Sequence, residues 1–158
     1  MGHQPRKSGC GYSDDGRLAP WYPTPVIPRA WQPVHRPADG EHVGYLVPDG
    51  APDLVLPVSL IGCALGPAHD RATAGALLRA RGLVALDRRW WCRLPDALPA
   101  GVLDASEPEP GWTWQPVVLV EVSPAGATVR PEFAAPGETG QAALPVPVGG
   151  LLRTQPPE

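Results

Sequence analysis

The sequence predicts a mainly β protein of the α+β class, with a small antiparallel sheet or barrel and one short helix. At 158 residues and 43% hydrophobic content, the chain suits one globular domain or two very small ones. Its 23 Pro and 18 Gly exclude long helices and indicate short strands joined by many turns. The β-branched run 117–122 precedes a Ser-Pro-Ala-Gly turn, which predicts an antiparallel hairpin with residues 127–133 and a left-handed Gly126.

A Pro-rich segment opens the chain after a polar, Gly-rich stretch, 1–20, that is typical of a flexible tail. From 20 to 37 a Pro recurs every few residues, which excludes a helix or a central strand. Trp21, Tyr22 and Trp31 lie among these prolines. The segment either packs across the folded part or serves as a proline-rich ligand for another protein. The cost of exposing such rings favours packing.

A first hairpin and the helix follow. Residues 41–47 and 54–61 have strand composition and flank a Pro-Asp-Gly turn, and Pro57 favours an edge position for the second strand. Asp70 is a good N-cap for a helix over 71–81, so that the helical region spans about 70–82, and Gly82 suits a left-handed C-cap. The helix presents a narrow apolar stripe, made of Ala74, Leu77, Leu78 and Ala80.

The strand 90–94 alternates, so Trp90, Cys92 and Leu94 are predicted to face the core while Trp91 and Arg93 face outward. The next connection, 95–110, is rich in Pro and acidic residues and is predicted to be a mobile surface loop.

The hairpin after this loop has a core face and an outer face. Val129 and Phe133 represent the core face of the return strand, and Arg130 lies on its outer face. Residues 144–148 are predicted to form a short edge strand. The full predicted core face consists of Trp114, Val118, Val120, Val122, Ala127, Val129 and Phe133.

The predicted organisation is a tail, 1–20, a Pro-rich segment with a hairpin, 21–66, a helix plus a barrel-like unit, 67–153, and a tail, 154–158. A single compact domain over 21–153 is the alternative. Trp-Gln-Pro-Val occurs at 31–34 and again at 114–117, which indicates either a duplicated β unit or a chance repeat in a chain rich in Pro and Val.

Composition narrows the environment and the partners. The net charge of −3 gives no general attraction to nucleic acid, although a local Arg patch remains open. Without an apolar run near the roughly 20 residues of a membrane helix, we expect no membrane partner. No apolar segment follows Arg6 and Lys7, so no secretory signal is predicted, and we expect a cytoplasmic protein. Lys7 is the single lysine beside abundant Ala and Arg, as is typical of a GC-rich bacterial genome.

Motifs for chemistry are scarce. Cys10, Cys63 and Cys92 have neither a disulfide framework nor metal-ligand spacing, so Cys63 and Cys92 are predicted to be small buried hydrophobes. Phosphate loops, nucleophile elbows and metalloprotease motifs do not occur. His42 is a candidate general base if the fold brings a carboxylate to it. We therefore predict no catalytic residue, no metal and no cofactor.

The region 88–153 has a Trp-bearing strand, a loop, a long hairpin and a Pro-Val-Pro-Val segment that runs into Leu152-Arg153. This layout resembles the SH3-like barrels of the Tudor type. The resemblance implies a module that binds a peptide or a modified residue through aromatic rings, which attract a cation within about 6 Å. A complete aromatic cage does not align with this sequence.

The class of function that the sequence favours is a non-catalytic module that binds a protein or peptide. Trp and Arg dominate interface energetics, and the candidate binding residues are Trp91, Arg93, Trp112 and Arg130. Two alternatives stay open. One is a nucleic-acid-binding protein that uses the arginines of the helix and of 88–93. The other is a small enzyme whose site assembles from distant residues. The sequence predicts no oligomeric state.

Overall fold

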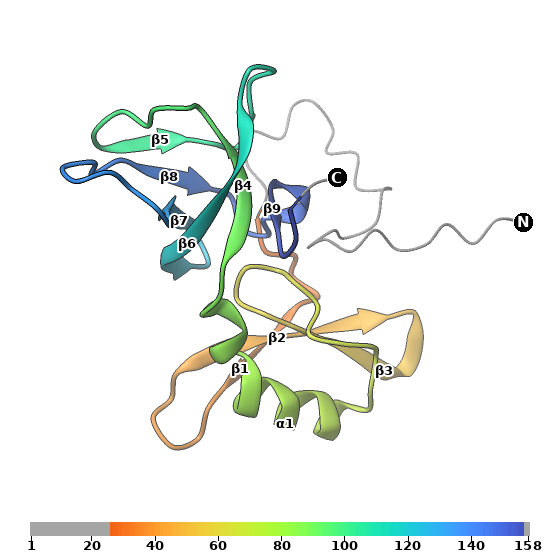
Figure 1. The fold of residues 1–158 in the computed structure, drawn as a ribbon. Helices are drawn as coiled ribbons and strands as arrows, with labels where there is room; N and C mark the ends of the chain where they lie inside the picture. The colour runs from red at the N-terminus through yellow and green to blue at the C-terminus, as the bar shows by residue number, and fades with distance from the viewer. Residues whose placement is uncertain (1–25, 157–158) are drawn as a thin grey trace, which may run out of the picture.

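A computed structural model describes residues 26–156, which form two β-sheets and one α-helix. The three-stranded sheet has the order β1-β2-β3, and the six-stranded sheet has the order β5-β8-β7-β6-β4-β9. In Figure 1 the smaller sheet and α1 lie at one end of the molecule, and β4 leads from them into the larger sheet. The mainly β prediction with a single short helix is therefore confirmed. The larger sheet ends in two edges, β5 and β9, so the SH3-like barrel is not confirmed.

The smaller sheet contains β1 (Gln32–His35), β2 (His42–Asp49) and β3 (Ala51–Val58). The predicted first hairpin is confirmed, because β2 and β3 pair antiparallel around Gly50, which has a φ of 79°. The second strand of this hairpin, β3, lies at an edge of the sheet as Pro57 indicated.

The helix α1 (Arg71–Arg81) has the predicted bounds. The Asp70 side chain caps it by accepting a 3.0 Å hydrogen bond from the Thr73 backbone N–H. The left-handed conformation predicted for Gly82 is wrong, because this residue has φ −58° and ψ −45°. Gly82 instead allows a close approach, since a Cβ there would lie 2.2 Å from the Val43 carbonyl oxygen. The buried helix residues are Ala74, Gly75 and Leu78, and Ala80 is exposed.

The six-stranded sheet contains the long predicted hairpin. Its strands are β4 (Trp90–Leu94), β5 (Val102–Asp104), β6 (Thr113–Ser123), β7 (Gly126–Pro131), β8 (Gln141–Leu144) and β9 (Leu152–Arg153). The hairpin closes with Ser123 opposite Gly126. Gly126 does not have the positive φ that the turn pattern predicted. Two short 3-10 helices, Val84–Leu86 and Gly149–Leu151, precede β4 and β9.

The predicted core face of β6 is wrong because a β-bulge interrupts the alternation. Val117 is fully buried and Leu119 packs against the core, whereas Val120 is 47% exposed. The pairing with β7 shifts between Leu119 and Glu121, which places the extra residue at Val120. Beyond this bulge Val122 returns to the core, as predicted. On the return strand, Ala127 and Val129 are buried as predicted, but Phe133 lies beyond the end of β7 and is 73% exposed.

Two other assignments also differ from the predictions. The connection 95–110 is not wholly a loop, because Val102–Asp104 forms β5, parallel to β8. The strand predicted at 144–148 lies earlier, at Gln141–Leu144, in the interior of the sheet between β5 and β7. The residues after it follow no strand, although Val146 and Val148 are buried in the core.

The Pro-rich segment lies partly outside the described residues, which include neither Trp21 nor Tyr22. Its described part packs on the fold as predicted: Trp31 is 7% exposed, and its ring centroid lies 5.6 Å from that of Tyr45. Both Trp-Gln-Pro-Val repeats mark the first strand of a three-stranded antiparallel meander, β1-β2-β3 in one sheet and β6-β7-β8 in the other.

The core of the larger sheet also includes residues from the loop after β3. Ile61 is fully buried within this core, and its carbonyl oxygen accepts a 3.0 Å hydrogen bond from the Val148 N–H. Among the cysteines, Cys92 is a buried free thiol as predicted, and burial raises its pKa to about 12. Cys63 is also buried in the core as predicted, but it is disulfide-bonded, which the sequence did not predict. Disulfides are characteristic of oxidising compartments and rare in the cytoplasm, so this one does not support the predicted location. The cytoplasmic location stays a prediction.

Candidate functional site

The outer face of the six-stranded sheet carries a group of Trp and Arg side chains. On β4, the alternation predicted from the sequence is confirmed, because Trp90, Cys92 and Leu94 are buried. Trp91 and Arg93 alternate with them and are half-buried, so they lie on the side of the sheet away from the core.

The strand register brings two further residues to this group. Trp91 lies between Pro116 on β6 and Arg153 on β9, and Arg93 lies opposite Trp114 on β6. The guanidinium carbon of Arg153 lies 4.4 Å from the centroid of the Trp114 ring, within the range of a cation–π contact. We call these four residues, Trp91, Arg93, Trp114 and Arg153, the Trp/Arg face. Trp114 was predicted to be core, and that prediction is wrong.

Arg93 is held at the edge of this face by the loop before β6. Its Nη2 donates to the Glu109 carbonyl oxygen at 3.2 Å, and its Nε donates to the Trp112 carbonyl oxygen at 3.4 Å. Within residues 26–156, neither Arg93 nor Arg153 forms an ion pair. Both guanidinium groups therefore keep their positive charge available to a carboxylate outside this region.

The other two predicted binding residues lie at the margins. The Trp112 ring packs against the core of the larger sheet, so this residue contributes to the face through its carbonyl group. Arg130 is exposed opposite Val118. Val118 is four positions along β6 from Trp114, which corresponds to about 13 Å in a strand. The structure thus groups Trp91 with Arg93 and leaves Arg130 apart.

The sequence named Arg89 only for the nucleic-acid alternative and Phe133 only as a core residue, and it did not predict that the two side chains meet. Arg89 forms an ion pair with Glu132, and its guanidinium carbon lies 5.5 Å from the exposed Phe133 ring. Sequence reasoning did not select Arg153 either, because that residue reaches Trp114 across β4 from the end of the described chain. The sequence signal was weak: an isolated arginine after two leucines.

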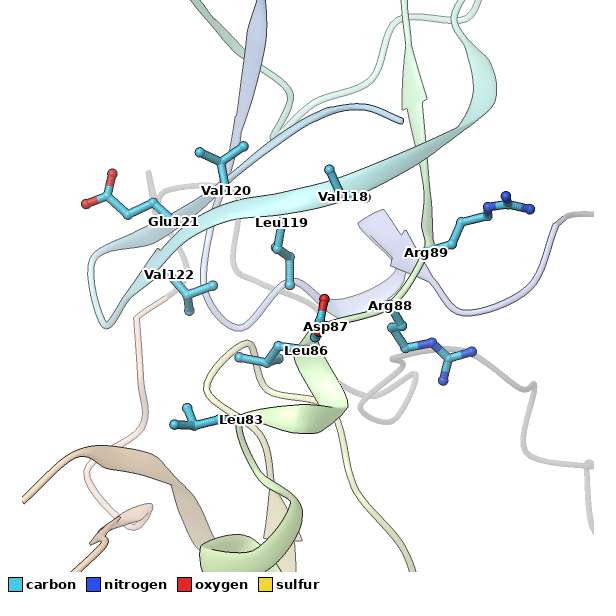
Figure 2. A pocket seen from close by; sticks show the side chains of 10 residues that line it. All are labelled: Leu83, Leu86, Asp87, Arg88, Arg89, Val118, Leu119, Val120, Glu121 and Val122. Carbon is cyan, nitrogen blue, oxygen red and sulfur yellow. The ribbon is translucent and has the colours of Figure 1, made fainter. Parts of the chain in front are cut away.

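A cavity of about 480 Å³ lies between β6 and the segment that joins α1 to β4. In Figure 2, Leu119 and Val122 of β6 point toward Leu86 and Leu83 on the opposite wall. Apolar and charged residues line the cavity together. The complete lining comprises Leu83, Leu86, Asp87, Arg88, Arg89, Val118, Leu119, Val120, Glu121 and Val122.

The histidine singled out by the sequence, His42, lies on the smaller sheet beside aromatic rings. Its ring stacks on His35 at 5.1 Å and meets Tyr45 edge-on at 4.8 Å. Its Nε2 is 3.0 Å from the Gly44 carbonyl oxygen, and burial lowers its pKa. No carboxylate within residues 26–156 hydrogen-bonds to this ring. The part of the chain that the structure describes also contains no cluster of His, Cys, Asp or Glu suited to a metal ion.

Comparison of the chain with protein-family models, with curated proteins and with solved structures gives no match. Across residues 26–156, no helix has the length and apolar character needed to cross a membrane. Function is therefore inferred here from the geometry of the surface.

Proposed function

We propose that this protein is a non-catalytic binding module that recognises a protein or peptide through the Trp/Arg face. The observation that carries the proposal is the stacking of Arg153 on Trp114, at 4.4 Å, with Trp91 and Arg93 beside them on paired strands. Trp and Arg are the residues whose truncation weakens interfaces most. Because strands fix their backbones, these side chains lose little further freedom when a partner binds.

The chemistry of the face favours an acidic partner. Arg93 and Arg153 each present a guanidinium group without an ion-pair partner among the described residues. A planar guanidinium group binds a carboxylate through two parallel hydrogen bonds. The rings of Trp91 and Trp114 supply apolar area between these charges. The expected ligand is therefore a segment in which acidic and apolar side chains alternate.

Binding of a labelled peptide tests this proposal. We expect a synthetic peptide of alternating Glu and Leu to change the Trp fluorescence of the protein, and its Gln-for-Glu counterpart to bind at least about tenfold more weakly. Arg93→Ala should weaken binding by a similar factor, because it removes a guanidinium group from the face. Arg81→Ala, at an exposed position at the end of α1, is the matched control and should leave the affinity unchanged. Equal binding of the two peptides, or binding of neither, would overturn the proposal.

A stability comparison separates the binding role of Trp91 from a structural one. Trp90 is 2% exposed, so Trp90→Ala should cost about 3–5 kcal/mol of unfolding free energy. Trp91→Ala should cost less, because its ring is half-buried on the outer face, yet it should weaken peptide binding. Chemical denaturation gives the stability of both variants. Equal destabilisation by both would make Trp91 a core residue and remove it from the binding face.

Binding of an oligonucleotide tests the nucleic-acid alternative. Its arginines divide between two places, because Arg71, Arg79 and Arg81 lie on α1 whereas Arg93 lies on the larger sheet. A single-stranded oligonucleotide that bound through phosphate contacts would lose affinity linearly on a log–log plot against salt. Such binding, with no binding of the acidic peptide, would replace the proposed function by nucleic-acid recognition.

A further inference from the structure

Strand β6 extends beyond its neighbour β4. Its first residues, Thr113 to Val117, pair with β4, and its pairing with β7 continues to Ser123. Residues 118–123 therefore have a neighbouring strand on one side and, within the described chain, none on the other. We call this side the free edge of β6.

The free edge has backbone groups that a further strand can use. Alternate residues of an antiparallel strand direct their N–H and C=O groups to opposite sides. The Pro116 carbonyl oxygen accepts a 3.0 Å hydrogen bond from the Glu132 N–H on the β7 side, so the next residue, Val117, directs its groups toward β4. The groups of Leu119, two residues later, are therefore expected to point toward the free edge. Outside the β6–β7 pairing, no backbone hydrogen bond among residues 26–156 involves positions 118–123.

The length of this edge distinguishes it from the two ends of the same sheet. The terminal strands β5 and β9 have 3 and 2 residues, and short edge strands discourage pairing with another chain. The edge of the smaller sheet at β3 is partly covered, because Val55 and Val58 bridge to His69 and Ala64. The free edge of β6 extends over positions 118–123, and the bulge at Val120 divides it into two short regular pieces.

The cavity of about 480 Å³ lies along this edge. Leu83 and Leu86 form its far wall, and Leu119 and Val122 point toward them from β6 (Figure 2). A strand placed here would set every second side chain into this cavity, beside Leu119 and Val122. The site thus offers backbone hydrogen bonds and a side-chain pocket together, which are the two components of peptide recognition by strand addition.

Charge at the two ends of the cavity indicates a direction. Trp90 pairs with Val117, so Asp87, Arg88 and Arg89 lie at the Val118 end, whereas Glu121 lines the cavity nearer the hairpin turn. At the Val118 end the charges are mixed, because Arg89 is paired with Glu132 and Arg88 lies beside Asp87, with its guanidinium carbon 5.6 Å from the centroid of the Trp90 ring. An antiparallel strand would run from the Glu121 end to the Val118 end. A basic residue at its start would complement Glu121.

We propose that the free edge of β6 binds an extended peptide segment of another protein as an added antiparallel strand. Its alternate apolar side chains enter the cavity between Leu83, Leu86, Leu119 and Val122, and its basic start lies at Glu121. A second copy of this chain is the competing occupant, and the dependence of protection on protein concentration distinguishes it from a peptide of another protein. This site is separate from the Trp/Arg face and does not rest on the function proposed for that face.

Hydrogen exchange with a defined probe tests the proposal. The probe is the synthetic peptide Lys-Val-Thr-Val-Thr-Val-Glu, and its control is the same peptide N-methylated at alternate residues, which removes one row of backbone donors. We expect the probe to slow amide exchange of Leu119 at least tenfold and the methylated control to have no effect. Leu83→Arg should weaken binding by filling the cavity. Val84→Arg is the matched variant, because Val84 is 72% exposed and does not line the cavity.

Four results would overturn the proposal. The first is an absence of binding at about 1 mM probe, since backbone hydrogen bonds are available from any sequence. The second is equal binding of the methylated control. The third is protection of Leu119 that depends on protein concentration without any probe, which would identify a second copy as the occupant. Loss of binding in Trp91→Ala but not in Leu83→Arg would move the peptide to the Trp/Arg face, and it likewise contradicts strand addition at β6.

Discussion

At the scale of single residues, His42 makes the stability of the protein depend on pH. Burial beside Tyr45 and His35 lowers the pKa of this imidazole below its usual value of about 6.5. The folded protein therefore binds a proton at this site less readily than the unfolded chain does. Its contribution to stability is present above the unfolded pKa and is lost as the pH falls through the folded pKa.

The expected result is a decrease in unfolding free energy when the pH falls below about 6.5, the ordinary pKa of histidine. In His42→Gln this part of the decrease should be absent, because glutamine does not titrate. Urea denaturation at a series of pH values measures both proteins. An identical slope in the variant would show that protonation of His42 is not coupled to folding.

At the scale of elements, the bulge in β6 decides which valines stabilise the hairpin. Val129 is fully buried, whereas Val120 at the bulge is 47% exposed. Val129→Ala should therefore cost on the order of 1–3 kcal/mol of unfolding free energy. Val120→Ala should change it by less than about 0.5 kcal/mol, as is usual at the surface. Chemical denaturation compares the two, and a larger loss for Val120 would contradict the position of the bulge.

Local patterns predicted the elements that local chemistry determines. The Asp70 cap, the Pro-Asp-Gly hairpin and the alternation of β4 each depend on a few neighbouring residues, and all three are present. The bulge at Val120 was not predictable, because a continuous run of Val and Leu residues has no signal for an extra residue. It reversed the expected faces of Val118 and Val120, since a shift of one residue moves side chains to the other face. Strand β5 was missed because its pairing with β8 is parallel and distant in sequence.

At the scale of the whole molecule, Ile61 connects the two sheets. It follows β3 in the chain but is fully buried in the core of the six-stranded sheet. Ile61→Ala should cost about 2–5 kcal/mol of unfolding free energy. The Ile61 side chain joins both sheets. In Ile61→Ala the unfolding transition followed by the helix signal in circular dichroism and the transition followed by Trp fluorescence should therefore shift together. Separate transitions in the wild-type protein would show instead that the two sheets unfold independently.

The candidate site was predictable only where it depends on neighbouring residues of one strand. Alternation on one strand predicted Trp91 and Arg93, and both lie on the outer face. The contact between Arg153 and Trp114 depends on the pairing of β9 with β4 and of β4 with β6, which joins distant parts of the chain. No local pattern contains that information. The free edge of β6 likewise appears only when the lengths of neighbouring strands are compared.

The buried thiol of Cys92 can report how fast the six-stranded sheet opens. It lies at the middle of β4, is 1% exposed, and has a pKa raised to about 12 by burial. Alkylating reagents attack the thiolate, so at neutral pH they should leave this residue unmodified until β4 separates from β6. The rate at which iodoacetamide labels Cys92 then reports how often these strands part, and a peptide that adds to the free edge of β6 should slow that reaction without touching the sulfur.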